Sequence, residues 1–214
     1  MKTSIENKSY TAYEFIKNKI LNNEYECGEI ISEKQVARDL QMSRTPVRSA
    51  FQKLESEGFL RIVPARGAIV QEMSIKEAKE IYDLRIAVET FVMKKAFSLI
   101  SQKDIDNLRN IIIKQKCAFQ NDDMKNCIKH DIEFHAYFLN LYRNDKIKEI
   151  VRNFRERFSA YGYIALIKPG RIYTTLKEHE EIVKALEKKD LELTIQKLEN
   201  HLENGKKHIL LQST

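Results

Sequence analysis

Apolar residues in the first quarter of the chain recur at the three- and four-residue spacing of amphipathic helices. A first helix is expected over about Tyr10–Asn22, with an inner face made of Ala12, Phe15, Ile16 and Ile20. A second, short helix has an inner face made of Val36, Ala37 and Leu40. The S-x-x-Q pattern from Ser32 to Gln35 predicts a capping box at the start of this second helix.

A third helix is predicted immediately after a turn at Gln41 and Met42. Ser43 is expected to cap it, and Pro46 is tolerated because amides in a first helical turn have no intrahelical partner. Gly58 supplies its end. Its inner face is predicted to consist of Val47, Ala50, Phe51 and Leu54, and another face of Arg44, Thr45, Arg48 and Gln52. Two short helices joined by a tight turn predict a helix-turn-helix.

Two strand-like runs follow, Phe59–Val63 and Ala68–Gln71, and the turn between them contains Gly67, which can adopt a positive φ. Together they predict a β-hairpin wing. A helix-turn-helix with a wing favours DNA binding, because the N-terminal end of its recognition helix enters the major groove. On an isolated charged helix, Arg44 and Arg48 would instead be interpreted as solvated surface charges.

The remainder of the chain keeps helical spacing, and no segment alternates convincingly as a strand. Ser74–Glu77 has the pattern of a capping box, which places the domain boundary after Met73. Further helix starts are predicted near Ser101, Asn121–Asp123, Asn144, Thr174 or Thr175, and Asp190, and the longest loop around Lys168–Gly170. The predicted fold is mainly α, with a winged helix-turn-helix over residues 1–73 and an all-α antiparallel helical bundle over residues 74–214.

Composition changes this interpretation only slightly. The formal net charge is +6, but residues 1–73 carry 11 Lys/Arg and 10 Asp/Glu, so bulk charge does not identify a DNA-binding domain. No apolar run approaches the roughly 20 residues that span a bilayer, and Met1–Tyr10 lacks a signal-peptide core, so we expect a cytoplasmic protein without a membrane partner. No function is assigned to the cysteines, Cys27, Cys117 and Cys127.

Polar residues on the apolar stripes of the helical half are the candidates for chemistry. Asp131 and His135 lie one turn apart on one predicted helix, and His179 lies on a later one. His201 shares the inner face of the last helix with Leu191, Ile195, Leu198 and Leu202. A lone buried histidine is more often a hydrogen-bonded core residue than a ligand. Three imidazoles and a carboxylate from three helices, however, can converge on a divalent metal ion.

The first part of the chain resembles the GntR family of regulators. The resemblance rests on four segments: Ser32–Ala37, Met42–Arg48, Leu54–Phe59 and Arg66–Val70. It implies DNA contacts by Lys34, Ser43, Arg44, Thr45 and Arg48, and an approach of the wing tip, Arg66 and Gly67, to the minor groove or the backbone. Cys27 departs from the family, which usually has proline there, but it affects only a turn.

The helical half is similar to the FCD effector domain of one GntR subfamily. Its short motifs appear in the expected order: Tyr82–Arg85 with Glu89, Asp131–His135, Asn144, Glu178–His179 and His201–Leu202. The resemblance implies a homodimer and a metal ion held by Asp131, His135, His179 and His201, with open positions for water or a carboxylate effector. Zn is expected first, although nitrogen and oxygen ligands also admit Ni, Mn or Fe.

Three further residues are expected near the effector. Arg85 either forms an intradomain pair with Glu89 or holds the far end of an organic acid bidentately. Tyr82 and Tyr161 are expected to line the pocket. The predicted function is transcription regulation, by a repressor that binds a near-palindromic operator in double-stranded DNA and responds to a small carboxylate.

Two alternatives stay open at this point. The helical half can be a metal-free dimerisation device with hydrogen-bonded histidines. It can also be a metal-dependent hydrolase, but a hydrolytic zinc needs a general base in reach and no H-E-x-x-H motif occurs. The prediction is therefore a regulator, not an enzyme.

Overall fold

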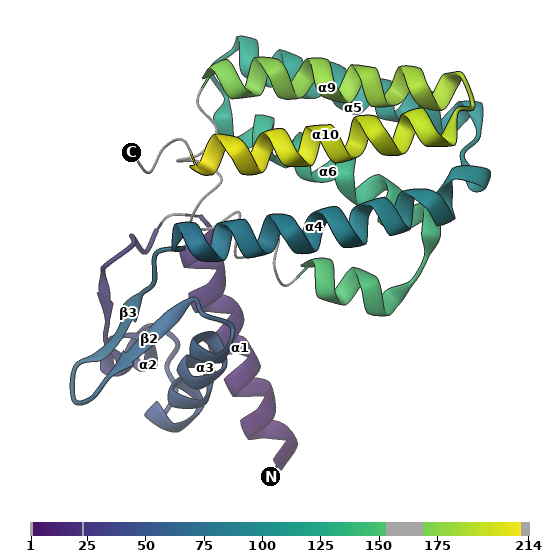
Figure 1. The fold of residues 1–214 in the computed structure, drawn as a ribbon. Coiled ribbons are helices and arrows are strands. Elements are labelled where there is room, and N and C mark those ends of the chain that lie inside the picture. Colours follow the sequence, from purple (N-terminus) through teal and green to yellow (C-terminus); the bar gives the residue numbers. More distant parts are fainter. Residues whose placement is uncertain (1, 23, 153–168, 211–214) are drawn as a thin grey trace. The chain divides into compact units, whose positions relative to one another are not determined.

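The computed structural model describes residues 2–22, 24–152 and 169–210, and these divide into two compact units on either side of the bond between Met73 and Ser74 (Figure 1). The first unit contains the helices α1 (Lys2–Leu21), α2 (Glu33–Asp39) and α3 (Arg44–Ser56). Its strands are β1 (Ile30–Ile31), β2 (Leu60–Val63) and β3 (Gly67–Val70). They form an antiparallel sheet in the order β1-β3-β2.

The winged helix-turn-helix is confirmed, with α2 and α3 joined by a turn and β2–β3 as the wing. Helix α1 packs against α3 over an apolar core. The buried side chains of this core include Ala12, Ile16, Ile20, Val36, Val47, Ala50, Phe51, Leu54, Phe59 and Leu60. Apart from Phe59 and Leu60, which belong to the first predicted strand, these are residues that the helical spacing placed on inner faces. The apolar periodicity therefore determines how the three helices pack.

The structure departs from the sequence-based expectations for this unit at one helix start, at two helix caps and at one strand. Helix α1 begins at Lys2, well before Tyr10. Neither Ser32 nor Ser43 makes a side-chain capping bond, and the Gln35 amide donates to Asp39 Oδ1 at 2.7 Å instead. The short strand β1 was not expected at all, because two residues are too few for an alternating pattern.

Gly67 is required by close packing at the start of β3. Its φ is +117°, and a Cβ at this position would lie 2.1 Å from the carbonyl oxygen of Ile31. Any larger residue would therefore push β1 and β3 apart. Ala65 in the wing turn also has a positive φ, +62°, which is unfavourable for a residue with a Cβ.

The second unit is built from helices throughout its described residues. These are α4 (Ile75–Ala96), a 3₁₀ turn (Phe97–Leu99), α5 (Gln102–Gln120), α6 (Met124–Tyr142), α9 (Pro169–Glu187) and α10 (Leu191–Leu210), with a further helical segment at 145–152. Helix α5 packs on α6 and α9, α10 packs on α4 and α9, and α4 packs on α6. Figure 1 shows α10 returning alongside α9, as expected for an antiparallel helical bundle.

Most helix starts in this unit lie where the sequence placed them. Ser101 and Asp104 form a full capping box, and the side chains of Asp123, Asn144 and Asp190 each accept a backbone N–H of the following turn. Ser74 accepts from the amide of Glu77 at 3.2 Å. Capping residues therefore set these boundaries.

Two predictions for this unit are wrong. Helix α9 already begins at Pro169 instead of Thr174 or Thr175, so Pro169 and Gly170 belong to a helix and not to a loop. Proline is favoured in a first helical turn because its missing N–H has no intrahelical partner there. Leu191 is 39% exposed, because it is the first residue of α10 and lies at the edge of the bundle.

No helix within the described ranges has both the length and the apolar character that crossing a membrane requires.

Candidate functional site

A basic hollow lies on the surface of the first unit. It has a volume of about 460 Å³ and is lined by the starts of α2 and α3 and by the wing: Ser32, Glu33, Lys34, Arg44, Arg48 and residues 62–67. Lys34, Ser43, Arg44, Thr45, Arg48 and Arg66, which were predicted to contact DNA, are all exposed, and Gly67 is half-buried. The structure therefore gathers Lys34, Arg44, Arg48 and Arg66 around one surface.

One of the four cations in the hollow is held by an acid. Arg48 donates from Nε to Oε1 and from Nη2 to Oε2 of Glu33, both at 3.0 Å. This pairing raises the pKa of Arg48. Within the described ranges, the side chains of Lys34, Arg44 and Arg66 form no hydrogen bond or ion pair. Three positive charges are thus available to phosphates.

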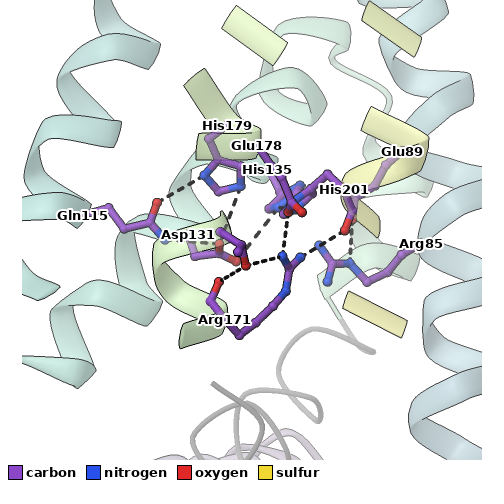
Figure 2. A network of polar contacts seen from close by, with 10 residues as sticks. Arg85, Glu89, Gln115, Asp131, His135, Arg171, Glu178, His179 and His201 are labelled. Atoms are coloured by element: carbon purple, nitrogen blue, oxygen red, sulfur yellow. Dashed lines mark hydrogen bonds and ion pairs between the residues drawn. The ribbon is translucent and has the colours of Figure 1, made fainter. Parts of the chain in front are cut away.

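The second unit contains a buried histidine cluster, made of His135 on α6, His179 on α9 and His201 on α10 (Figure 2). One ring nitrogen of each lies within 4.8 Å of the others. The Nε2 atoms of His135 and His201 are 3.1 Å apart. Helix α6 and the two consecutive helices α9 and α10 therefore bring their imidazoles to one point.

Asp131 lies beside this cluster, one turn before His135 on α6. Its Oδ1 is 3.7 Å from Nε2 of His179, and its Oδ2 is 4.0 Å from Nε2 of His135. The four residues predicted as metal ligands are thus close together in the structure.

Each histidine is oriented by an acceptor on its outer nitrogen. Nδ1 of His135 lies 2.7 Å from Glu89, and Nδ1 of His201 lies 2.7 Å from Glu178. Nδ1 of His179 lies 3.2 Å from Oε1 of Gln115. A carboxylate or amide oxygen at Nδ1 accepts a hydrogen bond from the Nδ1–H group, and this tautomer leaves the lone pair on Nε2. All three lone pairs then point into the cluster.

Burial favours the neutral form of His179 and His201. Desolvation lowers the pKa of His201 to about 4, although the hydrogen bond with Glu178 opposes the shift. Desolvation also lowers the pKa of His179 well below its ordinary value. Nε2 of His179 is a buried atom without a hydrogen-bond partner in the described part of the chain. Neutral imidazoles with inward lone pairs have the protonation state that a metal ligand needs.

Two arginines surround the cluster. Nε of Arg85 donates to Glu89 at 2.8 Å, and both side chains are buried, so the intradomain pair is formed. Arg171 donates to Oε2 of Glu178 at 2.7 Å and to the backbone oxygen of His201 at 3.1 Å. Each arginine therefore holds a carboxylate that itself binds a histidine.

Of the two tyrosines predicted to line the pocket, the structure describes only Tyr82. Tyr82 is buried and its ring centroid lies 5.1 Å from the guanidinium of Arg85. It packs against Gly205 of α10, where an added Cβ would lie 2.6 Å from the phenolic oxygen, so its packing joins α4 to α10. Tyr161 lies outside the described residues.

Two residues of the network were not predicted from the sequence. Gln115 follows Leu108 and Ile112 on the buried face of α5, so its placement among apolar residues was a usable signal. Its amide also donates to Asp131 at 3.2 Å. Arg171 lies two turns before Glu178 on α9, and only the structure shows that the two side chains meet.

Two family models match the chain, and they follow the two structural units. Residues 8–70 match the family described as bacterial regulatory proteins, gntR family. Residues 80–204 match the FCD domain, which alone covers more than half of the chain.

Similar proteins are transcriptional regulators. The gluconate operon transcriptional repressor of Bacillus subtilis (strain 168) is 27% identical over 198 residues, which cover 90% of this chain and 81% of that protein. The HTH-type transcriptional repressor RspR of Escherichia coli (strain K12) is 25% identical, covering 89% of this chain and 84% of that protein. The solved structure of E. coli McbR/YncC has the same fold, with a TM-score of 0.78 at 21% identity over 97% of this chain and 99% of that one.

These matches agree with the exposed cations of the first unit and with the all-helical second unit. They also exclude the hydrolase alternative, because the matched families and relatives are regulators. The chain belongs to the GntR family of DNA-binding transcriptional regulators and carries an FCD domain after its winged helix-turn-helix.

Proposed function

We propose that the chain is a repressor whose operator binding is controlled by a small carboxylate bound at a divalent metal ion in the FCD domain. Asp131, His135, His179 and His201 would hold the ion. The observation that carries this proposal is the orientation of the three imidazoles, whose Nδ1 atoms all face oxygen acceptors while their Nε2 atoms face one another. Among them, Nε2 of His179 is buried without a hydrogen-bond partner in the described part of the chain.

The donor set fits a divalent ion. Two imidazole nitrogens bound at about 2.0–2.1 Å to one ion lie roughly 2.8–3.4 Å apart, for angles between octahedral and tetrahedral. The two Nε2 atoms of His135 and His201 are separated by 3.1 Å. Without a cation or a shared proton, their lone pairs would repel each other. Zn is the first expectation, with Ni, Mn or Fe also compatible with these ligands.

A bound ion would supply open coordination positions to a carboxylate oxygen of the effector. The chain's own part is to fix the ligands, since Glu89, Gln115 and Glu178 orient the three imidazoles from behind. Arg85 remains the predicted contact for the far end of the acid. Arg171, which pairs with Glu178, is a second candidate for this contact.

Control of DNA binding requires two DNA-binding domains whose relative arrangement depends on the effector. We propose a homodimer formed through the FCD domain and a near-palindromic operator, because two linked half-sites raise both affinity and specificity. Glu178 connects α9 to His201 on α10, so an acid that completes the ion's coordination would reposition these helices relative to each other. Two of the relatives are repressors, which favours release of DNA as the outcome.

The rival function is a metal-free dimerisation domain. In that case a single shared proton would bridge His135 and His201 across their 3.1 Å separation. The rival predicts no stoichiometric metal and no response to acids, so the two functions are experimentally separable.

Titration of DNA at fixed salt tests the proposal. The operator is first recovered from a random duplex pool, and its affinity for the full chain is then measured with and without each of a panel of small carboxylates, gluconate included. We expect at least one acid to change the affinity by about 5- to 150-fold, and His179→Gln to abolish this response while keeping DNA binding. Unchanged affinity across the panel would contradict the proposal.

A further inference from the structure

Glu33 occupies an unexpected position for an acid, inside the basic hollow of the DNA-binding unit. It is the first residue of α2 and lines the hollow together with Lys34, Arg44 and Arg66. A carboxylate there lowers the attraction to phosphates and weakens non-specific DNA binding. We therefore expect Glu33 to have a role in DNA recognition that offsets its repulsion of the phosphates.

The pairing with Arg48 leaves one edge of the guanidinium available. An arginine has five N–H donors on three nitrogens. Glu33 takes the side edge, which consists of Nε–H and one N–H of Nη2. The end edge, consisting of Nη1 and the second N–H of Nη2, is not used by this carboxylate. That end edge is a pair of parallel donors with the spacing that O6 and N7 of guanine accept.

We propose that Glu33 is a positioning residue that fixes the guanidinium plane of Arg48 so that its end edge reads a guanine in each operator half-site. Arg48 lies in the second turn of α3, within reach of base edges when the start of the helix enters the major groove. Lys34, Arg44 and Arg66 make no such side-chain contact within the described residues and are suited to phosphates.

Stability alone does not account for the pair. The Arg48 side chain is 64% exposed, and an ion pair at such an exposed surface adds little to the free energy of folding. Orientation has a larger effect on recognition, because an arginine that is already fixed loses less side-chain entropy when it binds a base. The effect of Glu33 should thus appear in discrimination between sequences and not in thermal stability.

The test compares the full chain with Glu33→Gln, Arg48→Ala and the double variant. Sequences bound by each protein are selected from a random duplex pool, and affinities are then measured at fixed salt for the selected duplex, for one with the guanine replaced, and for an unrelated duplex. The wild-type pool should contain a fixed guanine in each half-site that Arg48→Ala no longer selects. Glu33→Gln should lower discrimination for this guanine by about 5- to 100-fold, with affinity for the unrelated duplex equal or higher.

Asp39→Asn is the matched control, because it removes the same charge from the same helix outside the hollow. It should leave discrimination unchanged, and the double variant should discriminate no worse than Arg48→Ala alone. Full discrimination by Glu33→Gln would overturn the proposal. So would a guanine still selected by Arg48→Ala, or an equal loss of affinity for all duplexes together with a lower melting temperature.

Discussion

The two units place their charged groups in opposite ways. In the DNA-binding unit, Lys34, Arg44, Arg48 and Arg66 surround a surface hollow above an apolar core. In the FCD domain, arginine, glutamate, aspartate and histidine side chains lie inside the bundle: Arg85, Glu89, Asp131, His135, His179 and His201. Buried charges need partners whereas exposed ones do not. The first unit is therefore complete without a ligand, whereas we propose that the second is organised around one.

This comparison predicts that the first unit is most sensitive to a change in backbone packing. Gly67→Ala would place a Cβ 2.1 Å from the oxygen of Ile31 at a φ of +117°. We expect a loss of roughly 4–5 kcal/mol in stability and the loss of operator binding, because both strain and a backbone clash are introduced. Thermal unfolding and DNA titration measure the two effects.

Gly170→Ala is the control for this substitution, since nothing lies within 4 Å of a Cβ at that position in α9. It should leave DNA binding unchanged and should not lower stability, because alanine favours a helix more than glycine does. Normal DNA binding by Gly67→Ala would show that β1 and β3 are not held at this spacing.

The second unit is predicted to depend on an ion. If the ion is present at about 1,000 times its dissociation constant, its removal costs about 4 kcal/mol of stability. A chelator should therefore lower the melting transition of the FCD domain in the full chain, while His179→Gln should make the transition insensitive to chelator. A transition that is equally high with and without chelator would favour the metal-free alternative.

Acid should destabilise the metal-free second unit through the buried rings. The pKa of His201 is about 4 in the folded chain, below its ordinary value of 6.5, so the unfolded chain binds the proton first as the pH falls. Stability should then decrease between pH 6.5 and about 4, by roughly 3 kcal/mol for a shift of this size. Urea unfolding of chelated protein at several pH values measures the slope.

His201→Gln is expected to flatten this slope relative to the unsubstituted chain. His130, which pairs with Glu133 at 2.8 Å outside the cluster, offers the control substitution His130→Gln, which should leave the slope steep. Identical slopes in all three proteins would mean that His201 does not titrate at a depressed pKa.

The smallest predicted effect is a gain in the wing. Ala65 has a φ of +62°, and glycine adopts this conformation without steric cost, so Ala65→Gly should stabilise the first unit by about 1 kcal/mol. Ala68→Gly is the contrasting change, because it removes a buried Cβ from β3 and should destabilise. A lower unfolding midpoint for Ala65→Gly would show that glycine's entropy in the unfolded chain outweighs the relief of strain.

The same contrast explains how far the sequence predicts the structure. The winged helix-turn-helix was predictable because its determinants are local: apolar positions at helical spacing, and a glycine at the start of β3. The three histidines and Asp131 were found because each lies on an apolar stripe. Ser32 shows the limit of local patterns, since its predicted partner Gln35 bonds to Asp39 instead.

The residues of the site that the sequence did not predict depend on tertiary contacts. Arg171 and Gln115 contact the cluster only after α5, α9 and α10 have packed, and no short-range pattern distinguishes Arg171 from other charged residues of its helix. The pairing of Glu33 with Arg48 likewise joins residues of two helices across a turn. Such cross-helix contacts set ligand orientation, which spacing alone does not reveal.

Metal content is the most direct test of the central claim that three imidazoles and Asp131 share one ion. Protein purified without an affinity tag is analysed for bound metals, alongside His179→Gln and the control His130→Gln. The account predicts about one divalent ion per chain in the unsubstituted protein and in His130→Gln, and its loss in a folded His179→Gln. A folded, DNA-binding chain without stoichiometric metal, or equal metal content in His179→Gln, would contradict it.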